Sequence, residues 1–318
     1  MAMVAERAGV SGQTVSRVVN GSPRVDPDTR VRVESAMAEL GYRPHRAARA
    51  LRTGRSQTIG LVVTTLSTVG NSRMLQATAE AAAQRGYALT LVTAARGVAE
   101  AFDRLAEQEV DGAIVLNEAS ALLSDAGRPT GLRLVVVDAP AEAGFTSVHS
   151  DHAGGAATAT ARLLELGHRT VHHLAGPEGS FAAAERERGW RETLASVGVD
   201  APSIVRGDWS ADSGHAAAAA LSASTAVFCA NDQMALGLVR ALSDAGRRVP
   251  EDVSVIGFDD VPDAANYRPP LTTIRQDFPA LAQRAVSSLI DAIEGDVETL
   301  EVSVVETGLV ERASTASR

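Results

Sequence analysis

Several apolar, strand-like runs of this chain end directly on side chains that can bind a polar ligand. Asp138, Asn231 and Asp259 each stand at the end of such a run, while Arg186 adds a guanidinium and Trp209 a flat aromatic face. Ligand pockets combine a mostly apolar lining with a few polar groups, and sugars suit such donors and acceptors beside an aromatic wall. Taken alone, each acid is better explained as a helix cap or a solvated charge. Together, the strand ends favour a binding site.

The elements that would position these side chains alternate between strand-like and helix-like runs. Strands are predicted at 59–63, 88–92, 112–116, 134–137, 170–174, 226–229 and 253–258. Helices are predicted near 71–86, 98–108, 154–167, 181–197, 211–222, 231–245 and 278–294, and Trp190 lies one helical turn after Arg186. This alternation predicts an α/β fold with parallel sheets covered by helices on both faces. The segment is too long for one such sheet, so we expect two similar lobes with the ligand at the strand ends.

The N-terminal segment has a different pattern, that of two short helices around a tight turn at Gly9. A third helix is predicted to begin at Asp26-Pro27, where Asp can cap and Pro fits the first turn, and to end before Gly41. Ser11 is placed to cap the second helix. Small apolar residues would pack the first two helices together, namely Ala5, Val10, Val15 and Val18. This arrangement predicts a helix-turn-helix, whose second helix enters the DNA major groove.

The exposed side chains of that second helix have the chemistry of base and phosphate recognition. Gln13 can contact adenine and Arg17 can contact guanine through paired hydrogen bonds. Thr14, Ser16 and Asn20 are suited to phosphate contacts. The alternative is a pair of amphipathic helices with no DNA-binding role.

Charge is distributed unevenly along the chain and supports the DNA-binding interpretation. The whole sequence has a net charge of −9, with 30 basic and 39 acidic residues. Residues 1–55 contain ten arginines and five acids, a balance of +5, so the remaining residues carry −14. A small basic head on an acidic body is typical of a DNA-binding module attached to another domain.

Other function classes find little support in the sequence. Cys229 is the only cysteine, so no internal disulfide can form, and it is predicted to be a core residue. We find no phosphate-binding loop, no His-Glu-x-x-His motif and no paired-cysteine zinc pattern, so the sequence predicts no enzyme, metal site or cofactor. His149, His152, His172 and His173 are interpreted as surface or core residues. No long apolar run or secretory signal is present, and we expect a cytoplasmic protein without membrane contact.

Residues 4–20 read Val-Ala-Glu-Arg-Ala-Gly-Val-Ser-Gly-Gln-Thr-Val-Ser-Arg-Val-Val-Asn and strongly resemble the lactose/galactose repressor family. The resemblance continues through 207–211, 230–237 and 269–278, and covers essentially the whole chain. It implies an α/β protein with an N-terminal three-helix helix-turn-helix head, a hinge, and a two-lobed sensor with parallel sheets like those of periplasmic binding proteins. The corresponding domains are 1–43, 44–56 and 57–318.

For DNA, the resemblance implies a homodimer bound to a near-palindromic double-stranded operator. Gly12 and Gln13 would carry most of the specificity with Arg17 beside them, and the hinge would fold on DNA and insert Leu51 into the minor groove as a wedge. Without the resemblance, Leu51 would be interpreted as a linker residue packed on the sensor. The predicted DNA-binding set is Ser11, Gly12, Gln13, Thr14, Ser16, Arg17, Asn20, Ala48 and Leu51. Family members usually have several residues before Val4, including a helix cap that Met1 does not offer.

For the sensor, the resemblance implies a small sugar effector. The predicted ligand-binding set is Thr64, Thr68, Asp138, Arg186, Trp209, Asn231, Asp259, Gln276 and Phe278. A β-galactoside inducer of a repressor is the first expectation, and another mono- or disaccharide is the alternative. Two further possibilities are a corepressor-type regulator, which binds DNA better with its ligand, and a solute-binding protein for transport, which would share the two-lobed body. The absence of a leucine heptad tail favours a dimer over a tetramer.

Overall fold

The computed structural model describes residues 1–19, 21–42, 54–117, 119, 131–140, 145–295 and 300–318. These residues form two compact units, Met1–Ser56 and Gln57–Arg318. The predicted division into 1–43, 44–56 and 57–318 stays a prediction, because residues 43–53 of the proposed hinge lie outside the described residues.

The N-terminal unit is built from three short helices, as predicted. They are α1 (Ala2–Ala8), α2 (Gly12–Val19) and α3 (Pro27–Glu39). Gly9 ends α1 in the left-handed conformation, with a φ of 64°, which glycine adopts without steric cost. Buried aliphatic side chains from all three helices, with Val25 from the segment before α3, form one small core, made of Val4, Ala5, Ala8, Val15, Val18, Val25, Val33 and Ala36. This core fixes which face of α2 remains exposed.

The predicted caps of this unit are confirmed. The Ser11 hydroxyl accepts a hydrogen bond from the Thr14 backbone N–H at 3.1 Å, and the Asp26 carboxylate accepts one from the Thr29 N–H at 3.0 Å. Such bonds satisfy N–H groups that a helix start otherwise leaves unpaired. Met1 gives α1 no side-chain cap.

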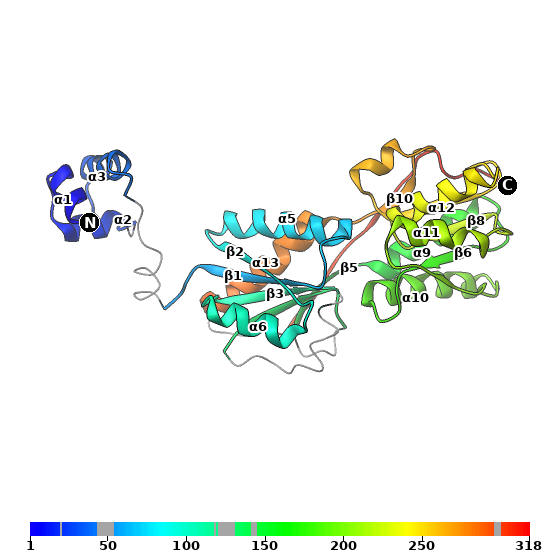
Figure 1. The fold of residues 1–318 in the computed structure, drawn as a ribbon, viewed down its shortest axis with the longest axis horizontal. Helices are drawn as coiled ribbons and strands as arrows, with labels where there is room; N and C mark the ends of the chain where they lie inside the picture. Colours follow the sequence, from blue (N-terminus) through cyan, green and yellow to red (C-terminus); the bar gives the residue numbers. More distant parts are fainter. Residues whose placement is uncertain (20, 43–53, 118, 120–130, 141–144, 296–299) are drawn as a thin grey trace. The chain divides into compact units, whose positions relative to one another are not determined.

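The larger unit contains two sheets. In the described part of the chain, the first has six strands in the order β11-β5-β4-β3-β1-β2, all paired in parallel. They are β1 (Thr58–Val63), β2 (Ala88–Thr93), β3 (Gly112–Leu116), β4 (Arg133–Val137), β5 (Thr146–Ser150) and β11 (Val302–Val305). One face is covered by α5 (Val69–Gln84) and α13 (Phe278–Gly295), and the other by α6 (Val98–Glu107), as Figure 1 shows. We call this layered body lobe 1.

The second sheet, over the same described residues, has the order β12-β10-β9-β8-β6-β7. Its strands are β6 (His172–Ala175), β7 (Val205–Arg206), β8 (Ala226–Cys229), β9 (Ser254–Asp259), β10 (Thr272–Arg275) and β12 (Gly308–Val310). It is covered on one face by α9 (His152–Glu165) and α10 (Phe181–Ser196), and on the other by α11 (Ala211–Ala216), the 3-10 turn η2 (Ala217–Ala219) and α12 (Asp232–Asp244). A further 3-10 turn, η3 (Pro262–Asn266), follows β9. We call this body lobe 2.

The chain passes between the lobes three times, after β5, after β10 and after β11. Each sheet therefore combines strands that are distant in sequence. The predicted two-lobed α/β architecture with parallel sheets is confirmed, with one local difference: β12 pairs with β10 in the antiparallel direction. The predicted helix 211–222 is also shorter, because η2 replaces its second half.

Helices α11 and α12 lie unusually close together because each contributes a glycine to their contact. A Cβ at Gly237 of α12 would lie 1.8 Å from the Ala211 carbonyl oxygen, and one at Gly214 of α11 would lie 2.1 Å from the Met234 carbonyl oxygen. Real Cβ atoms do not approach backbone so closely, so the glycines allow this packing.

Replacing Gly237 with alanine is therefore expected to force α11 and α12 apart and to destabilise the sensor by at least ~2 kcal/mol. Urea unfolding measures this loss. The control is Gly70→Ala in α5, where nothing lies within 4 Å of the added carbon, and where helix propensity favours alanine by up to ~1 kcal/mol. Equal stabilities for the two variants would show that the helices can separate at no cost.

His173 lies at the centre of the lobe 2 core. Its ring is fully buried and stacks on Phe228 with ring centroids 4.7 Å apart, and Nδ1 lies 3.0 Å from the Phe228 carbonyl oxygen, which makes Nδ1 the donor. Burial lowers the pKa of His173 to about 4. An unfolded chain has a histidine pKa near 6.5, so between these values the unfolded state binds more protons than the folded one.

The stability that depends on neutral His173 is thus present at neutral pH and is lost as the pH falls from about 6.5 to about 4, a loss of roughly 3 kcal/mol. We expect His173→Leu to flatten this part of the unfolding free energy between about pH 7 and pH 4.5. The same slope in wild type and in His173→Leu would contradict the assignment.

Candidate functional site

A cleft between the two lobes gathers most of the residues predicted to bind a ligand. It is lined by Thr68, Gly70, Met74, Asn117, Asp138, Ala182, Arg186, Trp209, Asn231, Asp259, Gln276, Phe278 and Leu281. Eight of the nine predicted ligand-binding residues are in this set. The exception is Thr64, which directly follows β1, is half-buried and does not line the cleft.

The strand ends position the cleft, as the sequence pattern predicts. Asp138 follows β4, Asn231 stands between β8 and α12, Asp259 ends β9, and Gln276 follows β10. The backbones of Asp138 and Asp259 have positive φ angles, 55° and 115°, so the chain turns sharply where each strand ends. Non-glycine residues rarely adopt this conformation, and it often accompanies functional sites. The remaining lining residues come from helices that begin or run beside these strand ends.

Arg186 of α10 is the central cation of the cleft. Its side chain is buried, and its guanidinium donates to the Ala230 carbonyl oxygen and lies 3.8 Å from a carboxylate oxygen of Asp259. The guanidinium carbon lies 3.8 Å from the ring centroid of Phe258 and 5.5 Å from that of Trp209. A planar cation between aromatic faces and a carboxylate is held in one orientation. It can therefore present fixed N–H donors to an acceptor in the cleft.

The two carboxylates of the cleft differ in their titration. Burial raises the pKa of Asp259 to about 6, although Arg186 and a 2.6 Å hydrogen bond from Gln276 act in the opposite direction. Burial also acts to raise the pKa of Asp138, but there the nearby His152 and Arg186 outweigh it and hold the pKa below its usual value. At neutral pH both groups are thus available as acceptors for hydroxyl groups.

Asn231 and Thr68 have structural contacts as well as places in the cleft lining. The Asn231 side chain accepts from the Met234 N–H at 2.9 Å, which caps α12, and donates to the Trp209 carbonyl oxygen at 3.0 Å. Thr68 caps α5 by accepting from the Asn71 N–H at 3.3 Å. Asn231 is therefore the cap of α12, and the same contacts hold it beside Trp209.

Two side chains near Arg186 have environments that the sequence does not specify. Trp190, one turn beyond Arg186, does not line the cleft: it is buried in the lobe 2 core and its Nε1 donates to the Val171 carbonyl oxygen at 2.8 Å. His152 is buried, in line with the core alternative predicted for the histidines, and its Nε2 lies 2.8 Å from Asp138 while its Nδ1 lies 3.2 Å from Arg186. Asn117, which follows β3, was missed, although its position after an apolar strand is the signal that identified Asp138.

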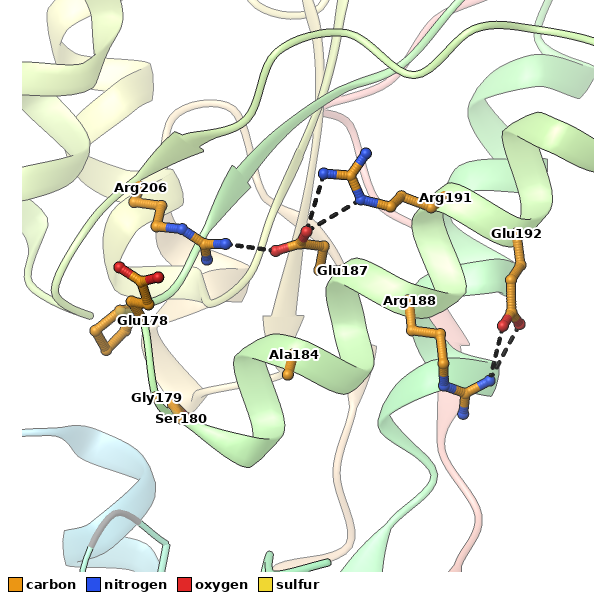
Figure 2. Close-up of a pocket in the computed structure, with 10 residues that line it drawn as sticks. Glu178, Gly179, Ser180, Ala184, Glu187, Arg188, Arg191, Glu192 and Arg206 are labelled. Carbon is orange, nitrogen blue, oxygen red and sulfur yellow. Dashed lines mark hydrogen bonds and ion pairs between the residues drawn. The ribbon is translucent and has the colours of Figure 1, made fainter. Parts of the chain in front are cut away.

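A second pocket lies on the outer side of α10 and contains none of the predicted residues (Figure 2). It is lined by Pro177, Glu178, Gly179, Ser180, Ala184, Glu187, Arg188, Arg191, Glu192 and Arg206. Its charges largely neutralise one another. Glu187 pairs with Arg206 at 2.7 Å and Arg191 at 3.0 Å, while Arg188 pairs with Glu192 at 3.1 Å. This pocket therefore lacks the convergent set of donors and acceptors found between the lobes.

In the N-terminal unit, α2 presents most of the predicted DNA-binding side chains to solvent. Ser11, Gly12, Gln13 and Arg17 are exposed, Thr14 and Ser16 are half-buried, and Val15 and Val18 face the core. Three members of the predicted set, Asn20, Ala48 and Leu51, lie outside the described residues.

Two other features of the unit bear on its charge. Arg7 of α1 is paired with Glu39 of α3 at 2.6 Å, and Arg30 donates to the Ser22 carbonyl oxygen at 2.7 Å. These two arginines therefore have partners within the unit. α2 itself contributes one arginine, Arg17, and its side chain is exposed.

Within the described residues, no group of three or more His, Cys, Asp and Glu side chains is placed to hold a metal ion. No helix in this part of the chain is long and apolar enough to cross a membrane.

Cys229 is buried in lobe 2, and its surroundings raise the pKa of the thiol. It is a core residue, as predicted.

Comparison with known proteins identifies both units. Residues 1–45 match the lacI family of bacterial regulatory proteins, and residues 160–315 match a periplasmic binding protein-like domain. The chain is 38% identical to the HTH-type transcriptional regulator CelR of Thermobifida fusca, over 98% of this chain and 97% of CelR. It is 37% identical to the lactose operon repressor of Escherichia coli K12, over 99% of this chain and 92% of the repressor.

Solved structures agree with these matches. The lac repressor dimer bound to operator and the anti-inducer ONPF has a TM-score of 0.86 at 34% identity, covering 99% of this chain and 98% of that chain. The CelR–cellobiose complex has a TM-score of 0.74 at 35% identity and covers 98% of both chains. Relatives above 30% identity match almost the entire length, so the chain belongs to the lacI family of bacterial regulatory proteins: it is a DNA-binding transcription regulator with a ligand-binding domain, and not an enzyme.

Proposed function

We propose that this regulator is a homodimeric repressor that binds a near-palindromic operator and is released from it by a small sugar. The observation that carries the proposal is the cleft between the lobes. It combines the polar groups of Asp138, Arg186, Asn231 and Asp259 with aromatic side chains, on the same chain as a helix-turn-helix head. Such a site suits a ligand with several hydroxyl groups and an apolar ring face.

Within this proposal, the cleft residues have distinct roles. The carboxylates of Asp138 and Asp259 accept hydrogen bonds from sugar hydroxyls, and Arg186 and Asn231 bind hydroxyl oxygens. Trp209 and Phe278 form the aromatic walls, and Thr68, with Thr64 further out, completes the side belonging to lobe 1. Gln276 supports the site by holding Asp259 in place.

The N-terminal unit reads the operator in the same proposal. Gln13 and Arg17 contact base edges, with Gly12 allowing close approach, while Ser11, Thr14, Ser16 and Asn20 contact phosphates. Residues 44–56 form the hinge, in which Ala48 and Leu51 contact the minor groove. The relative with an operator-bound structure is a dimer, which supports the proposed homodimer.

The proposed sugar is a β-galactoside, as the similarity to the lactose operon repressor suggests. Cellobiose is a second candidate because CelR, the relative with 38% identity, has been solved as a cellobiose complex. Both are β-linked sugars that offer hydroxyls on opposite edges of a ring, so the cleft chemistry alone accommodates either.

Effector control requires that the sugar bind one state of the regulator better than the other. For release, the sugar must favour the DNA-free state, and the two affinities are then coupled reciprocally by about 1–3 kcal/mol. The lobes are in contact in this structure: Arg73 of lobe 1 donates to the Asp260 carbonyl oxygen of lobe 2 at 3.2 Å. A sugar bound between them alters such contacts and hence the relative position of the lobes.

The test is fluorescence anisotropy of a palindromic operator from the upstream region of the regulator's own gene, bound to the full-length protein. Methyl β-galactoside, lactose and cellobiose are then titrated in. Release by one of these sugars supports an inducible repressor and identifies the sugar class. Tighter DNA binding in the presence of a sugar would replace the inducer with a corepressor, and a protein that binds sugar but no DNA would replace the repressor with a solute-binding protein.

A further inference from the structure

His152 lies at the boundary between the two lobes and contacts a residue of each. It is the first residue of α9 in lobe 2, its side chain is buried, and it lies between Asp138 at the end of β4 in lobe 1 and Arg186 of lobe 2. Nε2 is 2.8 Å from the Asp138 carboxylate. Nδ1 is 3.2 Å from Nη2 and 3.4 Å from Nε of Arg186.

These contacts determine the protonation state of the ring. A guanidinium can only donate, so Nδ1 must accept with its lone pair. A carboxylate at low pKa can only accept, so Nε2 must carry the proton and donate it to Asp138. The neutral Nε2–H tautomer is therefore the one form of His152 that satisfies both neighbours. Burial lowers the pKa of His152, which agrees with a neutral ring.

Other groups around the ring do not compete for its nitrogens. Phe181 and Phe258 present aromatic faces and edges to it, with centroid distances of 6.3 Å and 6.0 Å. The ionisable neighbours besides Asp138 and Arg186 are His149 of β5 and Glu185 of α10, which act on it only through longer-range charge effects. Ala182, which also lines the cleft, has no polar side chain to replace the link.

We propose that His152 is a positioning residue of the effector site: its neutral ring joins the hydroxyl-binding carboxylate of lobe 1 to the hydroxyl-binding guanidinium of lobe 2. This inference rests on the proposed function, since it assumes that Asp138 and Arg186 bind the effector. His152 orients the two groups from opposite sides of the cleft, so the effector meets an acceptor and a donor that are already in place. Preorganisation of this kind raises affinity without a direct contact to the ligand.

The test compares His152→Leu with His152→Gln in the full-length protein. Leucine removes both hydrogen bonds, whereas the glutamine amide can still donate to Asp138 and accept from Arg186. The sugar used is the one, methyl β-galactoside or cellobiose, to which the wild-type protein responds. We expect His152→Leu to weaken its binding by about tenfold or more, and His152→Gln to restore most of the affinity. Thermal unfolding checks that each variant is folded. His149→Leu, which changes the neighbouring ring, is the control and should bind like wild type.

A second measurement needs no sugar. Long-range proton–nitrogen NMR of protein with 15N-labelled histidine distinguishes the tautomers, and the His152 signals are those that disappear in His152→Gln. At neutral pH we expect a protonated Nε2 and an unprotonated Nδ1, with the ring signals shifting in Asp138→Asn. A protonated Nδ1, or wild-type affinity in His152→Leu, would overturn the inference. If wild-type protein bound none of the sugars, the proposed function would fail, while the NMR result would still decide the tautomer.

Discussion

Replacing Arg186 with alanine is expected to abolish the sugar response while effector-free protein keeps its operator affinity within about threefold. Arg186 donates to Ala230 and His152 and faces Asp259 inside the cleft. The substitution removes charge-assisted hydrogen bonds, each with a net value of about 1.5–3 kcal/mol, so sugar affinity should fall by about 100-fold or more. It also removes the cation with the larger effect on Asp259, since Arg186 lowers the pKa of that carboxyl more than Arg73 does, and so shifts it further towards the neutral form.

The control for this variant lies on the same helix. Arg188 of α10 is half-exposed and pairs with Glu185 and Glu192 on the outer side of lobe 2. Arg188→Ala should leave both the sugar response and the operator affinity unchanged, since such surface pairs contribute little. Anisotropy titrations of both variants, with and without sugar, provide the comparison. If Arg186→Ala lost operator binding together with thermal stability, Arg186 would be a structural residue rather than a sugar ligand.

A steep loss of operator affinity with salt is the second large effect. Residues 1–55 carry a net charge of +5 in each chain, whereas the rest of the chain carries −14. If a dimer neutralises about 6–10 phosphates, its affinity should fall by about 10³–10⁵ between about 50 and 200 mM salt, because bound counterions are released. Operator titrations across this range measure the slope of log affinity against log salt.

Single arginine variants show which part of the chain sets the salt effect. Arg17 is exposed on α2, so Arg17→Ala should weaken operator binding by about 1–3 kcal/mol per half-site if it contacts a base. Arg96→Ala, an exposed change just before α6 in lobe 1, should leave both affinity and slope as they are. A salt dependence that is nearly flat in the wild-type protein would contradict the assignment of the N-terminal unit as the DNA-binding surface.

Much of this architecture was predictable because its signals are local. Apolar runs identified the central strands, and the residues that follow them, Asp138, Asn231 and Asp259, do meet in one cleft. Helix caps at Ser11 and Asp26 were predictable for the same reason, since a cap depends on residues within one turn.

The remaining strands could not be predicted because they depend on distant partners. β5 and β10 are short and contain several polar residues, and the four residues of β11 are interrupted by Ser303, so none of them has the apolar run that marks a central strand. β11 forms only because the chain returns to lobe 1 and pairs with β5, more than 140 residues earlier. Pairing of this kind is set by tertiary structure and not by local composition.

The same limit applies to the surroundings of His152 and Trp190. His152 follows the helix cap Asp151, and its sequence neighbours give no sign that it faces Asp138 across the lobe boundary. Trp190 and Arg186 share a helix and differ by one turn, yet the packing of α10 places one in the core and the other in the cleft. Which face of a buried helix meets which neighbour is decided by the assembled fold.

Isothermal titration of sugar into the full-length protein, with and without operator, measures whether sugar and operator binding are coupled. The titrants are methyl β-galactoside and cellobiose. We expect one of them to bind the free protein about 5–150-fold more tightly than the operator complex, as reciprocal coupling requires. Equal affinities in the two titrations would mean that the cleft does not control DNA binding.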